Sequence, residues 1–469
     1  MSAVRAVPAP VTLRRRLGPI DAAAIVVSNV IGGGIFFVPV IVAGLVQSPW
    51  MLLSGWLMGG VLAFAGAMAY AELAALRPHA GGEYVYLRDA FGKVAAFLTG
   101  WTSFVAGFSG GIAVSAVALA GYIGRFLPAA ADQTPLITIP VLVTNLVVTK
   151  QSLVALSVIA IVSIIHLRDS GRIVHNTLAA VTVAALLVFI ALGLSFGSGS
   201  FANLTSTHTV EAPVSGWLLA LIPIMFTYSG WNAAVYVAEE IRNPEKNLPI
   251  ALGVGTLAVV AVYFALNMLY LYALPISDLA AVPTDRLTAA VAERLFGFVA
   301  GNVLAAFTII SIFASVSAMV LAGPRVYYAM SRDGVFLRSA GRVHPRHRTP
   351  MLAIVAQWIW SSTLVLSASQ EQLVSYTGFA LVLFSGIAVL SLFVLRRREH
   401  KIDRPFHALG YPIAPALFVV ASFVMVVNVI WQSPGPSLKG LVVILAGFPL
   451  YWLFGRRNGR HRKKLEAVK

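Results

Sequence analysis

Residues 28–36 read Ser28-Asn29-Val30-Ile31-Gly32-Gly33-Gly34-Ile35-Phe36. They lie inside residues 22–71, a run without Asp, Glu, Lys or Arg. This run is too long for one membrane crossing, because roughly 20 apolar residues span a bilayer as an α-helix. Each glycine disfavours a helix by about 1 kcal/mol relative to alanine. Three consecutive glycines therefore predict a membrane helix that is interrupted near its middle.

The composition also indicates a membrane protein. The 469 residues are 58% hydrophobic and 11% charged, with a mean hydropathy of +0.84, which the polar surface of a soluble domain does not allow. The net charge is +16, but the basic residues occupy short connectors between apolar runs. This pattern predicts contact with anionic lipid headgroups and not with nucleic acid. The absence of cysteine excludes thiol chemistry and a disulfide-linked subunit.

Eleven charge-free runs are candidates for membrane spans. They are 22–71, 94–124, 151–167, 173–210, 212–238, 247–277, 295–324, 349–370, 372–395, 405–438 and 440–455. Gln47-Ser48-Pro49-Trp50 divides the first run into two helices. We therefore expect an all-α integral membrane protein with about twelve spans.

Residues 133–149 also lack charge, but Pro135, Pro140 and Asn145 interrupt them and would leave backbone groups unsatisfied in lipid. We therefore predict a loop there. With the N-terminus inside the cell, most Lys and Arg then fall on the cytoplasmic side. The exceptions are Arg125, Lys150, Arg286, Arg294 and Lys439. The excess of positive charge inside predicts a cell-membrane protein with both termini in the cytoplasm.

A second interruption is predicted five helices later, at Phe226-Thr227-Tyr228-Ser229-Gly230-Trp231-Asn232. Interrupted spans at matching positions of two halves point to a transporter site built on inverted repeats. We expect a five-plus-five core over 17–395, with repeats at 17–196 and 214–395. Two additional helices are expected in 396–455, and basic tails at 1–16 and 456–469.

The two interruptions suit a zwitterionic ligand. The N–H groups of Gly32, Gly33 and Gly34, with the positive end of the following half-helix, favour a carboxylate. Carbonyl groups near Val30 and in the second interruption favour an ammonium group. Both charges of an α-amino acid are then met by backbone alone, without a formal protein charge at the bilayer centre, which costs about 2.5–3.5 kcal/mol. The glycine pairs 55/59 and 107/111 are interpreted instead as helix-packing positions.

Motifs along nearly the whole chain resemble the amino acid, polyamine and organocation transporter superfamily, above all its L-type amino acid transporters and their bacterial relatives. The motifs are Ile31-Gly32-Gly33-Gly34-Ile35-Phe36, Tyr70-Ala71-Glu72-Leu73, Gly81-Gly82-Glu83-Tyr84, Ser229-Gly230-Trp231-Asn232, Glu239-Glu240-Ile241-Arg242-Asn243-Pro244, Gly323-Pro324-Arg325-Val326-Tyr327-Tyr328 and Arg404-Pro405-Phe406. The resemblance implies alternating access around the two interruptions.

Carried over by position, the resemblance implies that Ile31 to Gly34 bind the substrate carboxylate. The amine would be held by carbonyls near Val30, Phe226, Thr227 and Ser229, with Gly230 in the same segment. Phe226 would be the gate. The position of Phe226 and Trp231 at the second interruption also predicts an aromatic lid and gate over the site, with ordinary apolar packing as the alternative. Glu72 and Arg77 are expected to have structural or gating roles, and a plain interfacial role stays open for Glu72.

The resemblance leaves the energy source open among sodium, proton and exchange. Many bacterial relatives carry a lysine in the fifth helix, whereas Thr182 occupies the matching position here and 173–210 contain no lysine. The candidate ion ligands are Ser28, Ile31, Thr182, Ser315 and Ser317, as oxygen donors for sodium. The alternative is that these hydroxyls bond to their own helix backbone.

The expected function is a secondary transporter or exchanger of amino acids and not an enzyme. The predicted pocket walls, near Ser109, Phe226, Ser311 and Phe379, are small or apolar, which favours small or hydrophobic neutral substrates. Cationic amino acids, polyamines or other amines are an alternative, and so is a receptor that binds without transport. We expect no cofactor, and no metal site at His344 and His347, which lack a nearby carboxylate or thiol.

Overall fold

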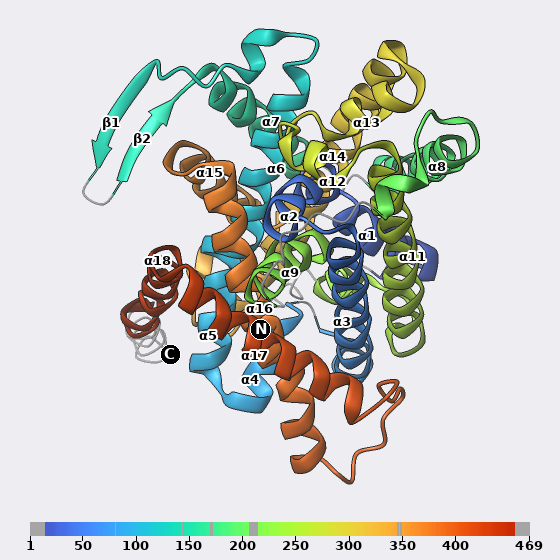
Figure 1. The fold of residues 1–469 in the computed structure, drawn as a ribbon. Coiled ribbons are helices and arrows are strands. Elements are labelled where there is room, and N and C mark those ends of the chain that lie inside the picture. The colour runs from blue at the N-terminus through green and yellow to red at the C-terminus, as the bar shows by residue number, and fades with distance from the viewer. Residues whose placement is uncertain are drawn as a thin grey trace, which may run out of the picture.

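Long apolar helices make up most of the structure, a computed structural model that describes residues 15–79, 81–141, 144–168, 172–205, 214–344, 347 and 349–454. Figure 1 shows these helices packed around α1 and α9, the helices that carry the two predicted interruptions. Of the expected basic tails, residues 1–14 and 456–469 lie outside the described residues.

Among the described residues, eight helical segments are long and apolar enough to cross a membrane, and four shorter apolar helices accompany them. The eight are α1 with its following turn (Pro19–Phe36), α3 (Pro49–Leu76), α5 to α6 (Lys93–Ile123), α7 (Lys150–Arg168), α11 (Pro244–Ala273), α14 (Phe298–Arg332), α16 (Gln370–Arg398) and α17 (Ile413–Gln432). The four are Ala180–Phe196 of α8 (Arg172–Phe196), α9 (Val214–Tyr228), α15 (Met351–Ser367) and Gly440–Phe454, which overlaps α18 (Pro434–Leu445). The predicted all-α membrane fold with about twelve spans is confirmed.

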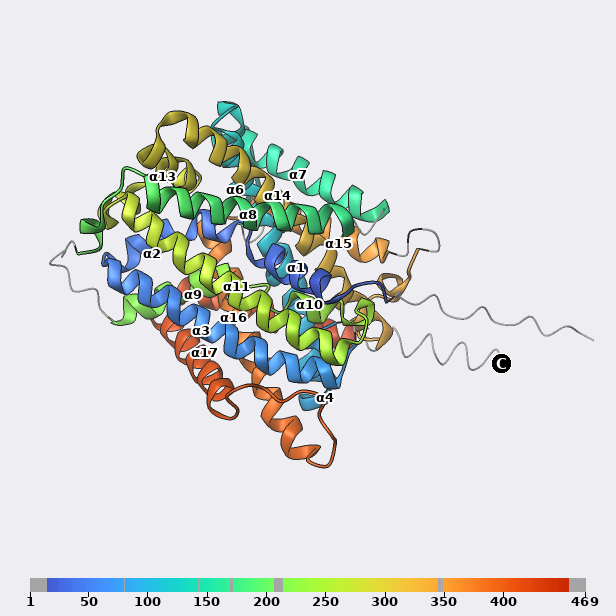
Figure 2. The same ribbon diagram turned by 90° about the vertical axis from the view of Figure 1, so that its right-hand side faces the viewer.

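The remaining helices are short and lie mainly between the spans. They are α2 (Val38–Val46), α4 (Glu83–Phe91), α10 (Ala233–Tyr236), α12 (Ile276–Ala281) and α13 (Leu287–Phe296). Figure 2 shows α3, α7, α8 and α11 running in a similar direction, with α4 and α10 toward one end of the molecule and α2 and α13 toward the other.

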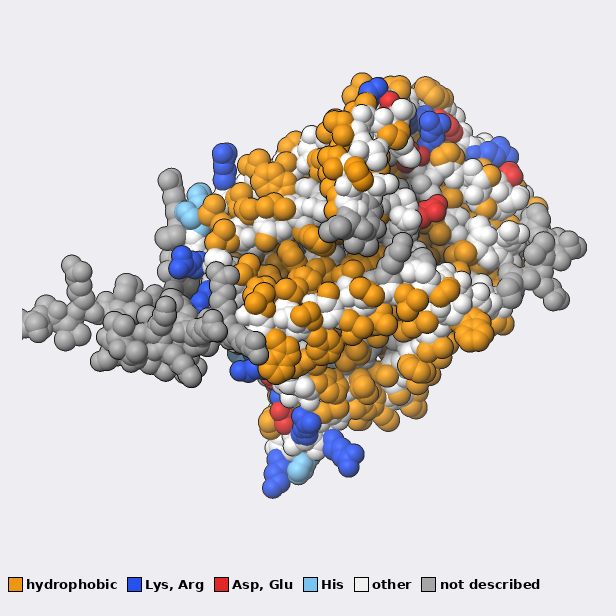
Figure 3. All heavy atoms as spheres, turned by 90° about the vertical axis from the view of Figure 1, so that its left-hand side faces the viewer, with side chains coloured by type: hydrophobic (Ala, Val, Ile, Leu, Met, Phe, Trp, Pro, Cys, Tyr) orange, Lys and Arg blue, Asp and Glu red, His pale blue; other side chains and the backbone are white. Residues whose placement is uncertain are grey.

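The outer surface of the spans is apolar. Hydrophobic side chains cover the middle of the face in Figure 3, and Lys and Arg side chains gather near its margins. On α17, Val420, Phe423 and Trp431 are exposed. An apolar surface of this extent is unfavourable in water but is satisfied by lipid, so the protein is a multi-pass membrane protein.

The charge-free segment 133–149, which was predicted to be a loop and not a membrane span, contains a β-hairpin. Strand β1 (Ile137–Val141) pairs antiparallel with β2 (Thr144–Val148), in a register that places Ile139 opposite Leu146. The prediction that no membrane helix forms here is confirmed, but the loop is more ordered than expected. The β-branched residues of both strands explain them, because such residues favour extended backbone.

A buried ion cluster joins the end of α3 to the end of α16. The Glu72 carboxylate is fully buried and accepts two hydrogen bonds from Arg396, at 2.6 and 2.8 Å. Arg404 donates at 3.1 Å and the Ala408 N–H at 2.7 Å, so the connector to α17 is held as well. This set, the Glu72 cluster, agrees with the structural role expected of Glu72.

Candidate functional site

Both predicted helix interruptions are present and they touch each other. The first span stops at Val30 and resumes as a 3-10 turn at Gly34–Phe36. The sixth stops at Tyr228 and resumes at Ala233. Between them, Gly230 has a φ of 101°, which favours glycine, and a Cβ there would lie 2.5 Å from the Asn29 amide nitrogen.

A cavity of about 60 Å³ opens between the two interruptions. This is several times the space that one water molecule requires. It is lined by Asn29, Val30, Gly33, Gly34, Ser103, Gly107, Phe108, Gly111, Ser115, Phe226, Thr227, Ser229, Gly230, Asn232, Tyr236, Ser315, Met319, Thr377 and Leu381. None of these lining residues is charged, so a ligand here meets only backbone dipoles, hydroxyls, amides and apolar groups.

The glycine segment presents backbone donors to this cavity. Gly33 and Gly34 both line it, and among the described residues neither N–H donates to an acceptor. The 3-10 turn and α2 follow at once, so the positive ends of their peptide dipoles face the same region. Free N–H groups at such a terminus form a site for a carboxylate.

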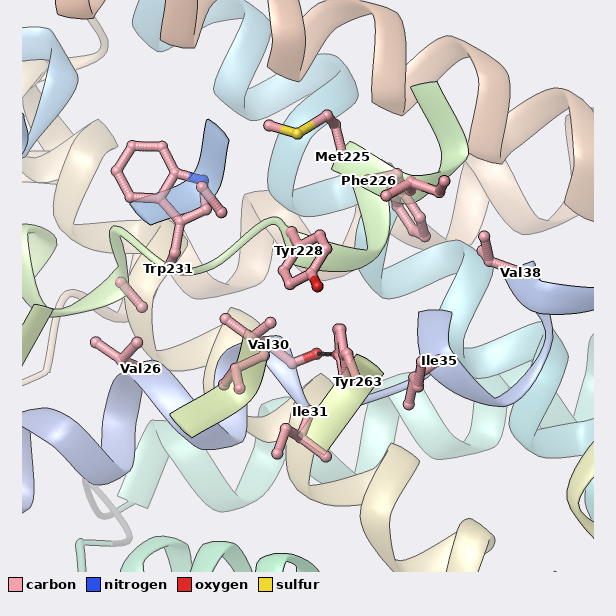
Figure 4. Packing of buried hydrophobic residues seen from close by; sticks show 14 of the residues in the cluster. Val26, Val30, Ile31, Ile35, Val38, Met225, Phe226, Tyr228, Trp231 and Tyr263 are labelled. Carbon is pink, nitrogen blue, oxygen red and sulfur yellow. Dashed lines mark hydrogen bonds between the residues drawn. The ribbon is translucent and has the colours of Figure 1, made fainter. Parts of the chain in front are cut away.

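The carbonyl groups of the two interruptions are joined by a residue that the sequence did not reveal. The Tyr263 hydroxyl of α11 donates to the Val30 carbonyl at 2.5 Å, drawn as a dashed line in Figure 4, and lies 3.4 Å from the Thr227 carbonyl. The Phe226 carbonyl accepts from the Ser229 N–H at 3.0 Å. The Val30 carbonyl also accepts from the Gly32 N–H at 2.8 Å. A carbonyl has two lone pairs, so the Phe226 and Thr227 carbonyls each keep an acceptor position, whereas both positions of the Val30 carbonyl are occupied.

The three glycines face different neighbours. A Cβ on Gly32 would lie 2.0 Å from the Ser315 Oγ of α14, and one on Gly34 would lie 2.8 Å from the Thr227 Oγ1. Gly32 is thus a close-packing position outside the cavity lining, unlike Gly33 and Gly34. Ile31 is buried and also lies outside the lining.

The two predicted gate residues lie apart. Phe226 lines the cavity, and its ring centroid is 6.4 Å from that of Phe37. In Figure 4, Trp231 and Phe226 lie on opposite sides of Tyr228. The Trp231 ring packs edge-on against the rings of Tyr70 and Phe418, with centroid separations of 4.7 and 6.1 Å. Trp231 is therefore outside the cavity lining, and Phe37 with Phe226 forms the aromatic pair beside it.

The candidate ion ligands are only partly brought together. Ser315 lines the cavity beside Gly32, and the Thr182 hydroxyl is buried without a hydrogen-bond partner in the described part of the chain. Ser28 donates to the Ala24 carbonyl at 2.7 Å, as a helix-interior serine commonly does. Ser317 is 2.7 Å from His166 Nε2 of α7.

The cavity walls differ from the residues expected by depth counting. Phe226 is a wall, but Ser109, Ser311 and Phe379 are not among the lining residues. A π-helical turn at Ser103–Gly107 separates α5 (Lys93–Thr102) from α6 (Phe108–Ile123). A π-turn holds extra residues and rotates all later side chains. Counting along a uniform helix therefore missed this local change.

The glycine pairs separate in the same way. Gly107 and Gly111 line the cavity, whereas a Cβ on Gly55 or Gly59 would meet Ile224 of α9 at 3.0 or 2.5 Å. The packing interpretation is confirmed for Gly55 and Gly59. For Gly107 and Gly111 it is incomplete, because these two residues form part of the cavity wall.

Comparison with known proteins places this architecture in a family. The sequence model described as amino acid permease matches residues 17–454. The chain is 27% identical to the serine/threonine exchanger SteT of Bacillus subtilis (strain 168), over 95% of this chain and 98% of the relative. It is 29% identical to the large neutral amino acids transporter small subunit 2 of Rattus norvegicus, over 94% and 81%. The human cystine/glutamate transporter is 28% identical, over 95% and 86%. The chain therefore belongs to the amino acid permease family, as an amino acid transporter of the membrane and not an enzyme.

Proposed function

We propose that this protein is a secondary transporter or exchanger that moves neutral amino acids across the cell membrane by alternating access. The observation that carries the proposal is the uncharged cavity between two broken helices, with the free N–H groups of Gly33 and Gly34 at its edge. A substrate carboxylate would accept from these N–H groups. Its amine would donate to the carbonyls of Phe226 or Thr227 or to Ser229, and to the Val30 carbonyl only by displacing the Gly32 N–H or the Tyr263 hydroxyl.

The size and polarity of the cavity favour a small or hydrophobic neutral side chain. Apolar groups of Phe108, Met319 and Leu381 line it beside the Ser103 and Thr377 hydroxyls. A cationic or anionic side chain would meet no opposite charge in this lining, and an unpaired charge there is costly. The names of the relatives include neutral substrates, namely serine, threonine and large neutral amino acids, and also the anionic glutamate. The neutral substrate is therefore proposed from the uncharged lining of the cavity.

The membrane orientation and the roles of the two repeats follow from the same proposal. Both termini would lie in the cytoplasm, according to the distribution of Lys and Arg along the chain. The repeats 17–196 and 214–395 would move relative to each other around the cavity. Phe226 would act as the gate over the bound substrate, with Phe37 packed beside it. Ser315 and Thr182 remain the strongest of the candidate ion ligands.

Uptake into proteoliposomes tests this proposal. Purified protein should accumulate radiolabelled serine, alanine or leucine, and counter-substrate inside the vesicles should accelerate uptake if the protein is an exchanger. Gly34→Ala should reduce uptake by at least about tenfold, because about 1.4 kcal/mol of lost binding has that effect and the new methyl group would overlap Thr227.

Gly44→Ala is the matched control, because a Cβ on that α2 glycine has no neighbour within 4 Å. It should leave uptake unchanged. If the vesicles take up only polyamines or arginine, the substrate is a cationic amine or amino acid and not a neutral amino acid. Binding in a thermal-shift assay without flux of any amino acid would indicate a receptor instead.

A further inference from the structure

One buried carboxyl group next to the cavity has no part in the function proposed above. Glu83 is the first residue of α4, which follows Gly81 and Gly82, and only 6% of it is exposed. Its Oε1 accepts a hydrogen bond from the Tyr70 hydroxyl at 2.6 Å and another from the Asn232 amide at 2.9 Å. Both donors are neutral groups.

No cation balances this carboxyl among the described residues. Five arginines at this end of the molecule pair with other carboxylates: Arg77 with Asp89 and Glu399, Arg88 with Asp89 and Asp333, Arg325 with Glu240, and Arg396 and Arg404 with Glu72. Arg398 donates to the Ala90 carbonyl instead. A buried carboxylate without a cation is unfavourable, so the neutral, protonated form is stabilised here.

Asn232 connects Glu83 to the substrate cavity. It lies in the interruption of the sixth span and lines the cavity, as does Tyr236 of α10. Its amide nitrogen donates to Glu83 and lies 3.0 Å from the Tyr236 hydroxyl. Any movement of this broken segment during transport therefore changes the hydrogen bonds and the water access of Glu83.

The titratable groups that face Glu83 are phenols. They are Tyr70 from α3, Tyr86 from α4 itself and Tyr236 from α10. Burial raises the pKa of Glu83 to about 7, although the hydrogen bonds from Tyr70, Asn232 and Tyr236 oppose the rise. A carboxyl group with this pKa binds and releases a proton near neutral pH, which is the range of the pH difference across a cell membrane.

We propose that Glu83 is a proton-binding site that couples proton movement to amino acid transport, and this rests on the transport function proposed above. The Glu83 carboxyl holds its proton while it is buried, and it is buried in this structure. It releases the proton when movement of the sixth-span interruption admits water. One proton then crosses with each substrate, without the fifth-helix lysine that this chain lacks.

The test measures the pH inside proteoliposomes with trapped pyranine while an external neutral amino acid is taken up. The full-length protein should acidify the lumen in proportion to uptake, and an inward proton gradient should drive accumulation. Glu83→Gln should abolish both effects and should exchange internal for external substrate at a rate that no longer depends on pH. Glu245→Gln, at the half-buried start of α11, is the matched control and should keep the proton movement.

A second variant separates proton binding from a purely structural role. Tyr70→Phe removes one hydrogen bond that favours the ionised form, so the midpoint of the pH profile of uptake should move to higher pH. Absence of uptake by the full-length protein would contradict the transport function itself. Uptake without acidification, or acidification that persists in Glu83→Gln, would overturn the proton site alone.

Discussion

Glu72 and Glu83 are two buried glutamates at the same end of the molecule, and their surroundings differ in charge. Glu72 is held by Arg396, Arg404 and a backbone N–H. Glu83 is held by a phenol and an amide. The first environment pairs the carboxyl group with two arginines and fastens α3 to α16. The second favours a proton. Burial by itself does not define the role of a carboxyl group, because the charge of its hydrogen-bond partners sets whether the ionised or the protonated form is favoured.

The largest expected effect comes from removing the charge of Glu72. Glu72→Gln would leave the partly buried Arg396 and Arg404 without their counter-ion. Breaking a fully buried pair costs about 3–5 kcal/mol, and the loss here is smaller because 20% of the Arg396 side chain is exposed. The melting temperature in detergent should fall clearly. Glu83→Gln, which leaves no cation unpaired, is the control and should fold normally. Equal losses of stability in the two variants would end the distinction between the two sites.

The pH dependence of stability gives the next effect. The pKa of Glu83 is raised to about 7 in the folded state, so the folded protein binds this proton more tightly than the unfolded chain does. The stabilisation is complete below the pKa of the unfolded carboxyl and is lost as pH rises toward 7. The loss amounts to roughly 3 kcal/mol, at about 1.4 kcal/mol per pKa unit.

Melting temperatures between pH 4.5 and 8 measure this effect. The difference between the parent protein and Glu83→Gln should change over this range in favour of the variant at high pH. A difference that is independent of pH would mean that Glu83 does not titrate in the folded protein.

The smallest effect distinguishes two tyrosines around Glu83. Tyr70→Phe removes a 2.6 Å hydrogen bond to the carboxyl and should lower stability by about 1 kcal/mol. Tyr86→Phe is the matched control, because the Tyr86 hydroxyl is buried without a hydrogen-bond partner among the described residues. Its loss should be neutral or slightly stabilising in the same melting assay. The opposite order would show that Glu83 is not held through Tyr70.

Several functional residues were beyond prediction because their partners are distant along the chain. Tyr263 reaches the Val30 carbonyl across 233 positions, and Asn232 reaches Glu83 across 149. The motif Gly81-Gly82-Glu83-Tyr84 was visible in the sequence, but not the absence of a cation around its carboxyl. The π-turn at Ser103–Gly107 likewise has no signal in a count of apolar residues, so the walls near Ser109 were misplaced.

The membrane environment, the approximate number of spans and the places where two of them break could all be predicted from the amino-acid sequence. These properties depend on local quantities, namely the length of charge-free runs and the low helix propensity of Gly32 to Gly34. The packing of Gly32 against Ser315, with Gly33 and Gly34 facing the cavity, became visible only in the folded structure. The same is true of the partners of the two glutamates, which are arginines for Glu72 and neutral donors for Glu83. The physical reason is that electrostatic and packing energies depend on neighbours in space, which the fold brings together from separate helices.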